Sequence, residues 1–424
     1  MTQLKTAYLY DKQFFVRKDK LMWEIAKNII FVEGAVNAAI YNLNTGDVYS
    51  LNSEGKQIVK KLIENEKITS NEQVYLKTLE KNGLLESSSQ TDIKPYTVPQ
   101  KRNILKLVWL EITQACNMHC LHCYEGQRHI VGSNTLTLEQ WKKIIDEIVD
   151  LGVRRVVVIG GEPCMHKNIV DILQYLRLKK ESLSITLFTN GYFFDERLFN
   201  IVIRNKIDVK VSLYGHTAEL HDSITGIKGS FLRLMSTIFR LTDNGINVNV
   251  AVTLMKENEK YYEDIKKFIQ ELPVRGYKFD VIREVVNGTQ NIHIPITKKV
   301  VDMAYRKRPN FYVKKDQFDN NIYYNSCWNG KMVITETGDI LPCVFARNHV
   351  CGNIKDEKLE DIIYRKTQLE KCWKSTYDEV DECKACEYRY ACHDCRPIAE
   401  SSKDIHAKNP RCKYNPLMGD WINE

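Results

Sequence analysis

The chain lacks any run of eighteen apolar residues, and its first twenty residues, "MTQLKTAYLYDKQFFVRKDK", lack an apolar segment followed by a small-residue cleavage site. A membrane-spanning helix needs the first pattern and a secretory signal peptide needs the second. We therefore expect no membrane association and a cytoplasmic protein. Charge is not concentrated either, because a net charge of +7 is spread over 424 residues. Such a distribution is typical of a solvated surface, so we expect no nucleic-acid partner.

Cysteine is unevenly distributed. None precedes Cys116 and none lies between Cys164 and Cys327, yet nine of the thirteen cysteines follow residue 320. The cytoplasm keeps thiols reduced, so disulfides are not expected. The spacing of these cysteines favours metal binding instead.

Residues 1–95 contain no cysteine and resemble a small α+β module. The stretch "AAIYNLNTGDVYSLN" alternates apolar and polar residues around a turn at 44–47, which predicts a β-hairpin. The stretches "SEGKQIVKKLIEN" and "NEQVYLKTLEKNGLLE" have apolar residues at helical spacing, with Ser53 and Asn71 as expected capping residues. A hairpin beside two short helices predicts a winged-helix-like domain.

Residues 104–315 alternate strand-like and helix-like segments. The strand-like runs are "ILKLVWLEI", "RRVVVIG", "LSITLFTNG", "IDVKVSLYG", "INVNVAVTL" and "YKFDVI". Strict alternation predicts an α/β fold with a parallel sheet, here a partial (β/α)6 barrel of the TIM type, with its chemistry at the carboxyl ends of the strands. The motifs "TQAC", "GGEP", "TNG" and "SLYG" fall at the ends of the first four runs.

Three cysteines, Cys116, Cys120 and Cys123, follow the first strand-like run with no fourth cysteine in the next forty residues. Structural zinc requires four ligands, so a zinc site here would have to be completed from elsewhere in the chain. Thiolates also suit iron and sulfide, and three of them fit a four-iron, four-sulfur cluster with one iron left open to bind a small molecule.

The segment "CNMHCLHC" resembles the CxxxCxΦC motif of the radical S-adenosylmethionine (SAM) superfamily, with His122 in the Φ position. The resemblance implies that SAM binds the open iron and yields a 5′-deoxyadenosyl radical, which takes a hydrogen atom from the substrate. It also implies eight SAM-binding residues, of which His122 belongs to the cysteine motif and the others lie at the strand ends: Gly160, Gly161, Glu162, Pro163, Thr189, Asn190 and Ser212. Glu162 would hold the SAM amino group, since a carboxylate suits an ammonium.

Residues 320–424 resemble the SPASM domain, an extension that binds two auxiliary four-iron, four-sulfur clusters. The resemblance implies that one cluster takes Cys327, Cys343 and Cys395 and the other takes Cys383, Cys386, Cys392 and Cys412. This chain has two residues between Cys392 and Cys395 where the family usually has three, so the partition can differ. Cys351 is a further candidate ligand or a structural thiol, whereas Cys164 and Cys372 are expected to be small buried side chains.

Radical SAM enzymes with this extension commonly modify ribosomally made peptides, and residues 37–65 resemble the leader-binding peptide chaperone of pyrroloquinoline quinone synthesis. The resemblance implies a peptide maturase with three clusters and SAM, a precursor-peptide partner and a flavodoxin or ferredoxin reductant. We expect a thioether from a peptide cysteine, as in sactipeptides and ranthipeptides. The alternatives are a carbon–carbon or carbon–oxygen crosslink, epimerisation, and formylglycine formation as in sulfatase maturases.

Two further interpretations come from the residues themselves. Paired CxxC motifs also occur in zinc ribbons, so a nucleic-acid-binding protein is the alternative from a different class. His221 and Asp222, in "HTAELHDSITG", are possible acid or base groups, although such a pair more often holds a loop.

Overall fold

The computed structural model describes residues 23–64, 66–87, 104–124, 134–285, 292–304, 312–365, 367–393 and 395–422. The chain divides into two compact units. One comprises Asn103–Ala304 and Trp328–Trp373, and we call it the barrel unit. The other comprises Met1–Arg102, Tyr305–Cys327 and Lys374–Glu424, and we call it the terminal unit. The domain limits expected from the sequence remain predictions.

The barrel unit is built on one eight-stranded sheet in the order β11-β10-β9-β8-β7-β6-β12-β13. Its strands are β6 (Leu107–Glu111), β7 (Arg155–Ile159), β8 (Ser184–Thr189), β9 (Asp208–Ser212), β10 (Val248–Leu254), β11 (Gly276–Val281), β12 (Lys331–Ile334) and β13 (Ile340–Leu341). Strands β6 to β11 are parallel to their neighbours, β12 joins β6 in parallel, and only β13 runs antiparallel. All six predicted strands are confirmed, as is the partial (β/α)6 barrel.

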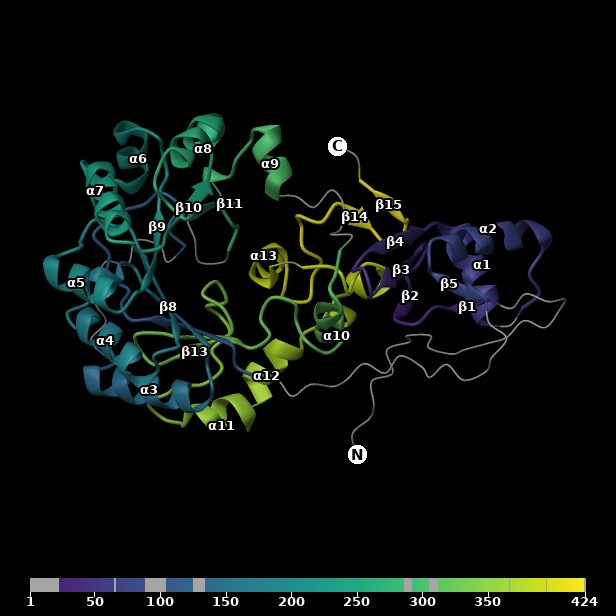
Figure 1. The fold of residues 1–424 in the computed structure, drawn as a ribbon, viewed down its shortest axis with the longest axis horizontal. Coiled ribbons are helices and arrows are strands. Elements are labelled where there is room, and N and C mark those ends of the chain that lie inside the picture. The colour runs from purple at the N-terminus through teal and green to yellow at the C-terminus, as the bar shows by residue number, and fades with distance from the viewer. Residues whose placement is uncertain are drawn as a thin grey trace. The chain divides into compact units, whose positions relative to one another are not determined.

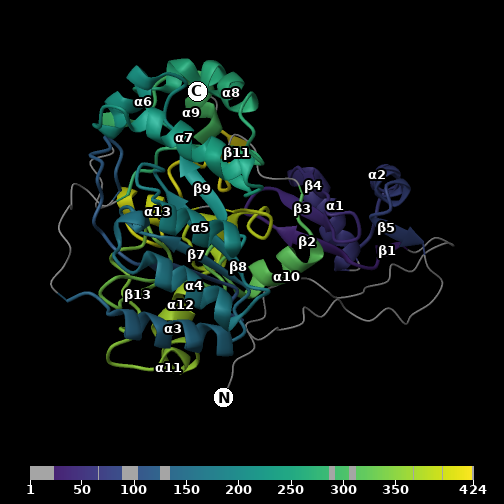
Figure 2. The same ribbon diagram turned by 60° about the vertical axis from the view of Figure 1, so that its left-hand side comes forward.

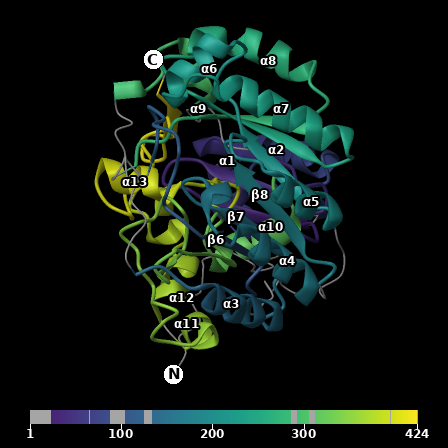
Figure 3. The ribbon, with the colours of Figure 1, turned by 90° about the vertical axis from the view of Figure 1, so that its left-hand side faces the viewer.

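Helices connect the parallel strands and lie on the outer side of the sheet (Figures 1 and 3). They are α3 (Leu138–Asp150), α4 (Ile169–Lys179), α5 (Glu196–Arg204), α6 (Ala218–Thr225), α7 (Ser230–Asp243), α8 (Tyr262–Gln270) and α9 (Lys298–Ala304), with 3-10 turns η1 (Pro163–Met165) and η2 (Glu259–Tyr261). Helix α3 begins with a capping box, in which Thr137 and Gln140 each bond the other's backbone N–H. Such caps satisfy N–H groups that a helix start leaves without intrahelical partners.

Two more helices complete the barrel unit: α11 (Leu359–Tyr364) and α12 (Thr367–Lys374), of which the last residue belongs to the terminal unit. Helix α11 lies beside α3, where the backbone N–H of Leu359 donates to Glu147 (2.9 Å; Figure 2). Trp373 anchors α12 to β12 through a bond from its indole N–H to the carbonyl of Lys331 (2.8 Å).

The terminal unit begins with a three-stranded antiparallel sheet and two helices. The elements are β1 (Trp23–Ile25), β2 (Ile29–Glu33), β3 (Ala38–Asn42), β4 (Val48–Leu51), α1 (Ser53–Ile63), α2 (Ser70–Lys81) and β5 (Leu85–Ser87). The sheet order is β2-β3-β4, and β1 pairs with β5. The predicted hairpin and both helices are therefore present. The expected capping residues were wrong, because Asn52 and Thr69 cap the two helices.

Two later segments of the chain, Tyr305–Cys327 and Lys374–Glu424, complete the terminal unit. They form α10 (Lys315–Tyr323), η4 (Tyr377–Glu379), η5 (Cys383–Ala385), α13 (Arg396–Ser402), β14 (Tyr414–Asn415) and β15 (Asp420–Trp421). One hydrophobic core joins the first sheet to α1 and α2. A second core joins the same sheet to residues 313–322 and 388–414 and includes Tyr41, Phe318 and Tyr390. The early strands are thus buried partly by the end of the chain.

Across the residues that the structure describes, no helix combines the length and the apolar character that crossing a membrane requires.

Candidate functional site

The three cysteines of the CxxxCxxC motif follow β6 on a segment that we call the cysteine loop, residues 112–124. Two backbone bonds tie this loop to the end of α6: the N–H of His119 donates to Thr225 (2.9 Å) and that of Leu121 donates to Ile224 (3.1 Å). Within the loop, the N–H of Met118 points at the sulfur of Cys116 (3.4 Å). Anchoring at two points fixes where the loop presents its thiols.

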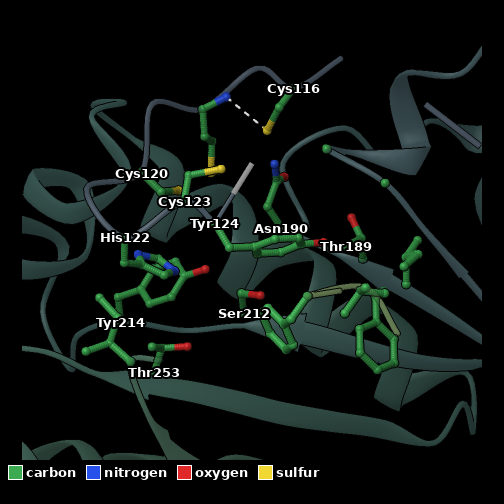
Figure 4. A pocket seen from close by; sticks show the side chains of 18 of the residues that line it. Cys116, Cys120, His122, Cys123, Tyr124, Thr189, Asn190, Ser212, Tyr214 and Thr253 are labelled. Carbon is green, nitrogen blue, oxygen red and sulfur yellow. Dashed lines mark hydrogen bonds between the residues drawn. The ribbon is translucent and has the colours of Figure 1, made fainter. Parts of the chain in front are cut away.

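Cys116, Cys120 and Cys123 border one cavity of about 470 Å³, a size typical of small-molecule sites. Figure 4 shows the cysteines on one side of it and the ends of β8, β9 and β10 on the other. Six of the eight predicted SAM-binding residues also line it: His122, Gly160, Gly161, Thr189, Asn190 and Ser212. The structure thus brings together residues from four separate strand ends.

The three thiols match the ligand set of a four-iron, four-sulfur cluster that leaves one iron open. Within the described ranges, no three His, Cys, Asp or Glu side chains converge closely enough to hold a single metal ion. A four-iron cluster takes its thiolates on different irons, so three separate cysteines on one side of the cavity fit it. Burial raises the pKa of the Cys116 thiol to about 11, and it raises that of Cys120 further. Iron must therefore displace protons when it binds.

Gly160 and Gly161 directly follow β7 and lie against the cysteine loop. The N–H of Gly161 donates to the carbonyl of Thr113 (2.7 Å), and that of Glu162 donates to Ala115 (2.8 Å). A Cβ at position 160 would lie 2.2 Å from the carbonyl oxygen of Thr113. At position 161 it would lie 2.4 Å from that of Gln114. Both residues are therefore glycine because the cysteine loop packs directly on them, a reason that adds to any contact with SAM.

Gly160→Ala is expected to displace the cysteine loop, because the added methyl group meets backbone atoms that cannot rotate away. We expect the rate of SAM cleavage to fall about tenfold, which corresponds to roughly 1.4 kcal/mol in the activation free energy. Iron content after anaerobic reconstitution should fall with it. Gly276→Ala is the control, since its Cβ would meet only Asn249 at 3.4 Å. Equal iron content in the two variants would contradict this role of Gly160.

Glu162 does not line the cavity. Its carboxylate is fully buried and accepts bonds from the N–H of Cys164 (3.0 Å), the hydroxyl of Thr189 (2.7 Å) and the N–H of Asn190 (2.6 Å). Burial still raises the pKa of this carboxyl above its ordinary value. Glu162 therefore joins the end of β7 to the end of β8, and Pro163 starts the 3-10 turn that follows. Direct contact of Glu162 with SAM remains a prediction.

Asn190, His122 and Ser212 face the cavity from different elements. The Asn190 amide donates to the side chain of Asn117 in the cysteine loop (2.9 Å). The His122 ring lies 4.5 Å from that of Tyr214, edge to face, and burial lowers the pKa of His122 to about 4. At neutral pH this imidazole is therefore uncharged and part of an aromatic wall.

His221 and Asp222 have structural roles. Asp222 accepts bonds at the start of α7 from the N–H groups of Gly229 (2.5 Å) and Phe231 (2.8 Å) and the hydroxyl of Ser230 (2.8 Å). His221 accepts a bond from the N–H of Tyr214 (3.2 Å), and burial lowers its pKa to about 4. Neither residue lines the cavity, so the pair holds a loop rather than supplying acid or base.

Sequence reasoning missed a buried ion pair between Glu111, the last residue of β6, and Arg347, which follows β13. The two guanidinium nitrogens lie 3.1 and 2.6 Å from the carboxylate oxygens. The side chains are only 2% and 14% exposed. Two residues before Arg347, Phe345 enters the cavity and contacts Tyr124, which follows Cys123 (ring centroids 5.0 Å apart). The pair thus fixes one wall of the cavity.

The predicted ligands of the second auxiliary cluster, Cys383, Cys386, Cys392 and Cys412, all belong to the terminal unit. Cys383 and Cys386 share one tight turn, in which the N–H of Cys386 donates to Cys383 (2.9 Å). Burial raises the pKa of Cys386, and the neighbouring Glu387, Cys392 and Cys383 add to the effect. Cys383, Cys386 and Cys392 are therefore close enough to influence one another. The role of all four cysteines as ligands remains a prediction.

The predicted ligands of the first auxiliary cluster belong to two different units of the chain. Cys327 and Cys395 belong to the terminal unit and Cys343 to the barrel unit. Cys351 and Cys372 are both buried in the barrel unit. A hydrogen bond between their thiols raises the pKa of Cys351. The structure therefore pairs Cys351 with a cysteine that the sequence assigned to no site.

Comparisons with known proteins agree with this geometry. The model of the radical SAM superfamily matches residues 110–269, and that of SPASM, an iron–sulfur cluster-binding domain, matches residues 327–387. The chain is 27% identical to the antilisterial bacteriocin subtilosin biosynthesis protein AlbA of Bacillus subtilis, over 70% of this chain and 69% of that protein. It is 24% identical to the AdoMet-dependent heme synthase of Oleidesulfovibrio alaskensis, over 80% of this chain and 94% of that protein.

Among solved structures, Streptococcus suis SuiB bound to its precursor peptide SuiA has a similar fold. The TM-score is 0.61 at 17% identity, and the match covers 93% of this chain and 100% of SuiB.

Proposed function

Because the chain is an enzyme of the radical SAM superfamily with a SPASM iron–sulfur domain, we propose that it is a maturase that modifies a ribosomally made precursor peptide. One observation carries the proposal: the three thiols of the cysteine loop and the SAM-type strand ends border the same cavity. AlbA is named for bacteriocin biosynthesis, and SuiB has been solved with its precursor peptide. The similarity to a heme synthase indicates that related enzymes also act on other substrates. The identity of the substrate as a peptide is therefore what the experiment must test.

When bound, the cluster and SAM supply a carbon-centred radical that removes a hydrogen atom from an unactivated carbon. The residues of this chain prepare the site for that chemistry. Cys116, Cys120 and Cys123 would hold three irons, while Gly160 and Gly161 keep the cysteine loop close to the end of β7. Glu162 holds the end of β8 in place, so that Thr189 and Asn190 line the SAM side of the cavity.

The first sheet of the terminal unit is the proposed leader-binding site. Its order, β2-β3-β4, puts β2 and β4 at the edges. An extended peptide can join such an edge through backbone hydrogen bonds, which give affinity with little demand on sequence. The leader would then hold the precursor while its core is modified.

The favoured reaction is a thioether link between a cysteine and an unactivated carbon of the peptide. The hydrogen atom would leave in 5′-deoxyadenosine and the thiol proton would go to solvent. The one electron left over would need an acceptor, which an iron–sulfur cluster would supply. Two auxiliary clusters in the cysteine-rich tail, for a total of three, would accept that electron. A flavodoxin or ferredoxin would supply the electron that starts the reaction. Carbon–carbon or carbon–oxygen crosslinking is the second candidate.

The test is mass spectrometry of the anaerobically reconstituted, reduced enzyme with SAM and the short cysteine-containing peptide encoded nearest its gene. We expect 5′-deoxyadenosine together with a peptide lighter by two hydrogen atoms, and fragmentation then locates the new bond. An unchanged peptide mass with 5′-deoxyadenosine present would exclude crosslinking of this peptide. A lack of 5′-deoxyadenosine from enzyme with its full iron content would overturn the radical assignment.

A further inference from the structure

The cavity has a second wall that the SAM-type motifs do not include. It is formed by the ends of β10 and β11 and by the segment after β13: Thr253, Asp280, Val281, Ile282, Val344 and Phe345, with Arg283. Among the described residues that line the cavity, Asp280 and Arg283 are the only carboxylate and the only guanidinium. Their neighbours on this wall are mostly apolar.

Asp280 and Arg283 form an ion pair in which an Arg283 nitrogen lies 2.7 Å from a carboxylate oxygen of Asp280. The guanidinium carbon lies 4.8 Å from the centroid of the Phe345 ring. The pair and the ring together restrict a side chain that would otherwise have many rotamers, which lowers the entropy lost when a ligand binds. The side chains are still 46% and 30% exposed, so both remain accessible from the cavity.

We propose that Asp280 and Arg283 anchor the main chain of the core peptide beside the residue to be modified. This inference rests on the proposed function and adds the substrate contact to it. A peptide unit presents one acceptor and one donor, and the pair offers the complement: guanidinium N–H groups for the carbonyl oxygen and carboxylate oxygens for the amide N–H. Such contacts read the backbone and leave the side chain to be selected separately.

The side chain selected beside this anchor is apolar. Val281, Ile282, Val344 and Phe345 line the cavity together with the pair. Their side chains offer an apolar surface, and covering such a surface favours an apolar side chain. The favoured target is therefore an aliphatic or aromatic residue whose neighbouring peptide unit is held by Asp280 and Arg283.

The experiment measures steady-state kinetics of the full-length, reconstituted enzyme with SAM and the cysteine-containing peptide encoded nearest its gene. Arg283→Gln and Asp280→Asn are each expected to raise KM for the peptide about tenfold, the effect of losing one charge-assisted hydrogen bond. KM for the peptide should rise at least fivefold more than KM for SAM. Arg283→Lys keeps the charge but loses the planar donor geometry. Its KM for the peptide should therefore lie between that of Arg283→Gln and that of the wild type.

Glu196→Gln is the matched control, because Glu196 pairs with Arg240 on the exposed surface of the same unit. It should leave both KM values unchanged. If KM for the peptide is unchanged in both Asp280→Asn and Arg283→Gln, this inference is wrong, while the proposed function still stands. An equal or larger rise in KM for SAM would also overturn it, because the pair would then bind SAM. If the wild-type enzyme turns over SAM and makes no peptide product, the proposed function itself falls.

Discussion

Cys120→Ser should abolish cleavage of SAM, leaving less than about 1% of the wild-type rate, because a serine hydroxyl is a poor ligand for iron where a thiolate is required. The residue lines the cavity between the other two cysteines of its loop. The measurements are iron and sulfide content, the electron paramagnetic resonance signal of the reduced enzyme, and 5′-deoxyadenosine formation.

Cys372→Ala is the matched control for this experiment. Cys372 is buried in the same unit but does not line the cavity, so its loss should leave SAM cleavage within about twofold of wild type. If Cys120→Ser kept its SAM cleavage, the cysteine loop would not be the site of the chemistry.

Arg347→Met is expected to destabilise the barrel unit by about 3–5 kcal/mol, because it leaves the buried carboxylate of Glu111 without its partner. The segment 343–349 should loosen, and with it Phe345 in the cavity wall. Hydrogen exchange of the anaerobic, reconstituted enzyme should show faster exchange at the end of β6 and in this segment. Peptide modification should fall more than SAM cleavage, because Phe345 lines the cavity beside Arg283, the proposed peptide anchor.

The double variant Glu111→Leu, Arg347→Met removes both charges. Comparing its stability with that of Arg347→Met separates the cost of losing the ion pair from the cost of burying the Glu111 carboxylate alone. It should recover part of the lost stability, since a buried ion pair replaced by apolar groups is often tolerated. Lys142→Met is the surface control, because Lys142 pairs with an exposed Glu139 and such pairs contribute only about 0–1 kcal/mol. Equal exchange rates in Arg347→Met and Lys142→Met would contradict the assigned role of Arg347.

Local patterns were enough to predict the main elements of the sheet and the placement of its motifs. Parallel strands end at one edge, so the order of strand and motif along the chain already placed the cysteine loop near Gly160, Thr189 and Ser212. The capping residues were misplaced although a readable signal existed, since Thr69 and Glu72 have the spacing of a capping box.

Other features could not be predicted because they join distant residues. Glu111 and Arg347 are 236 positions apart, and no periodicity links them. A charged residue at the end of an otherwise apolar strand was the one available signal, because a buried carboxylate needs a partner. The inward direction of Glu162, away from the cavity, depends likewise on Thr189 and Asn190 at a neighbouring strand end.

The second core of the terminal unit has a consequence for the order of folding. Asn37 bonds the hydroxyl of Tyr414, which lies 377 positions further along the chain, and Tyr41 bonds the carbonyl of Glu387. Contacts of such high sequence separation are slow to form, because a long loop must close before they stabilise anything. During synthesis one face of the first sheet therefore stays uncovered until residues 388–414 have left the ribosome. Strands β2 to β4 are thus synthesised before the barrel unit, yet their packing is completed only after it.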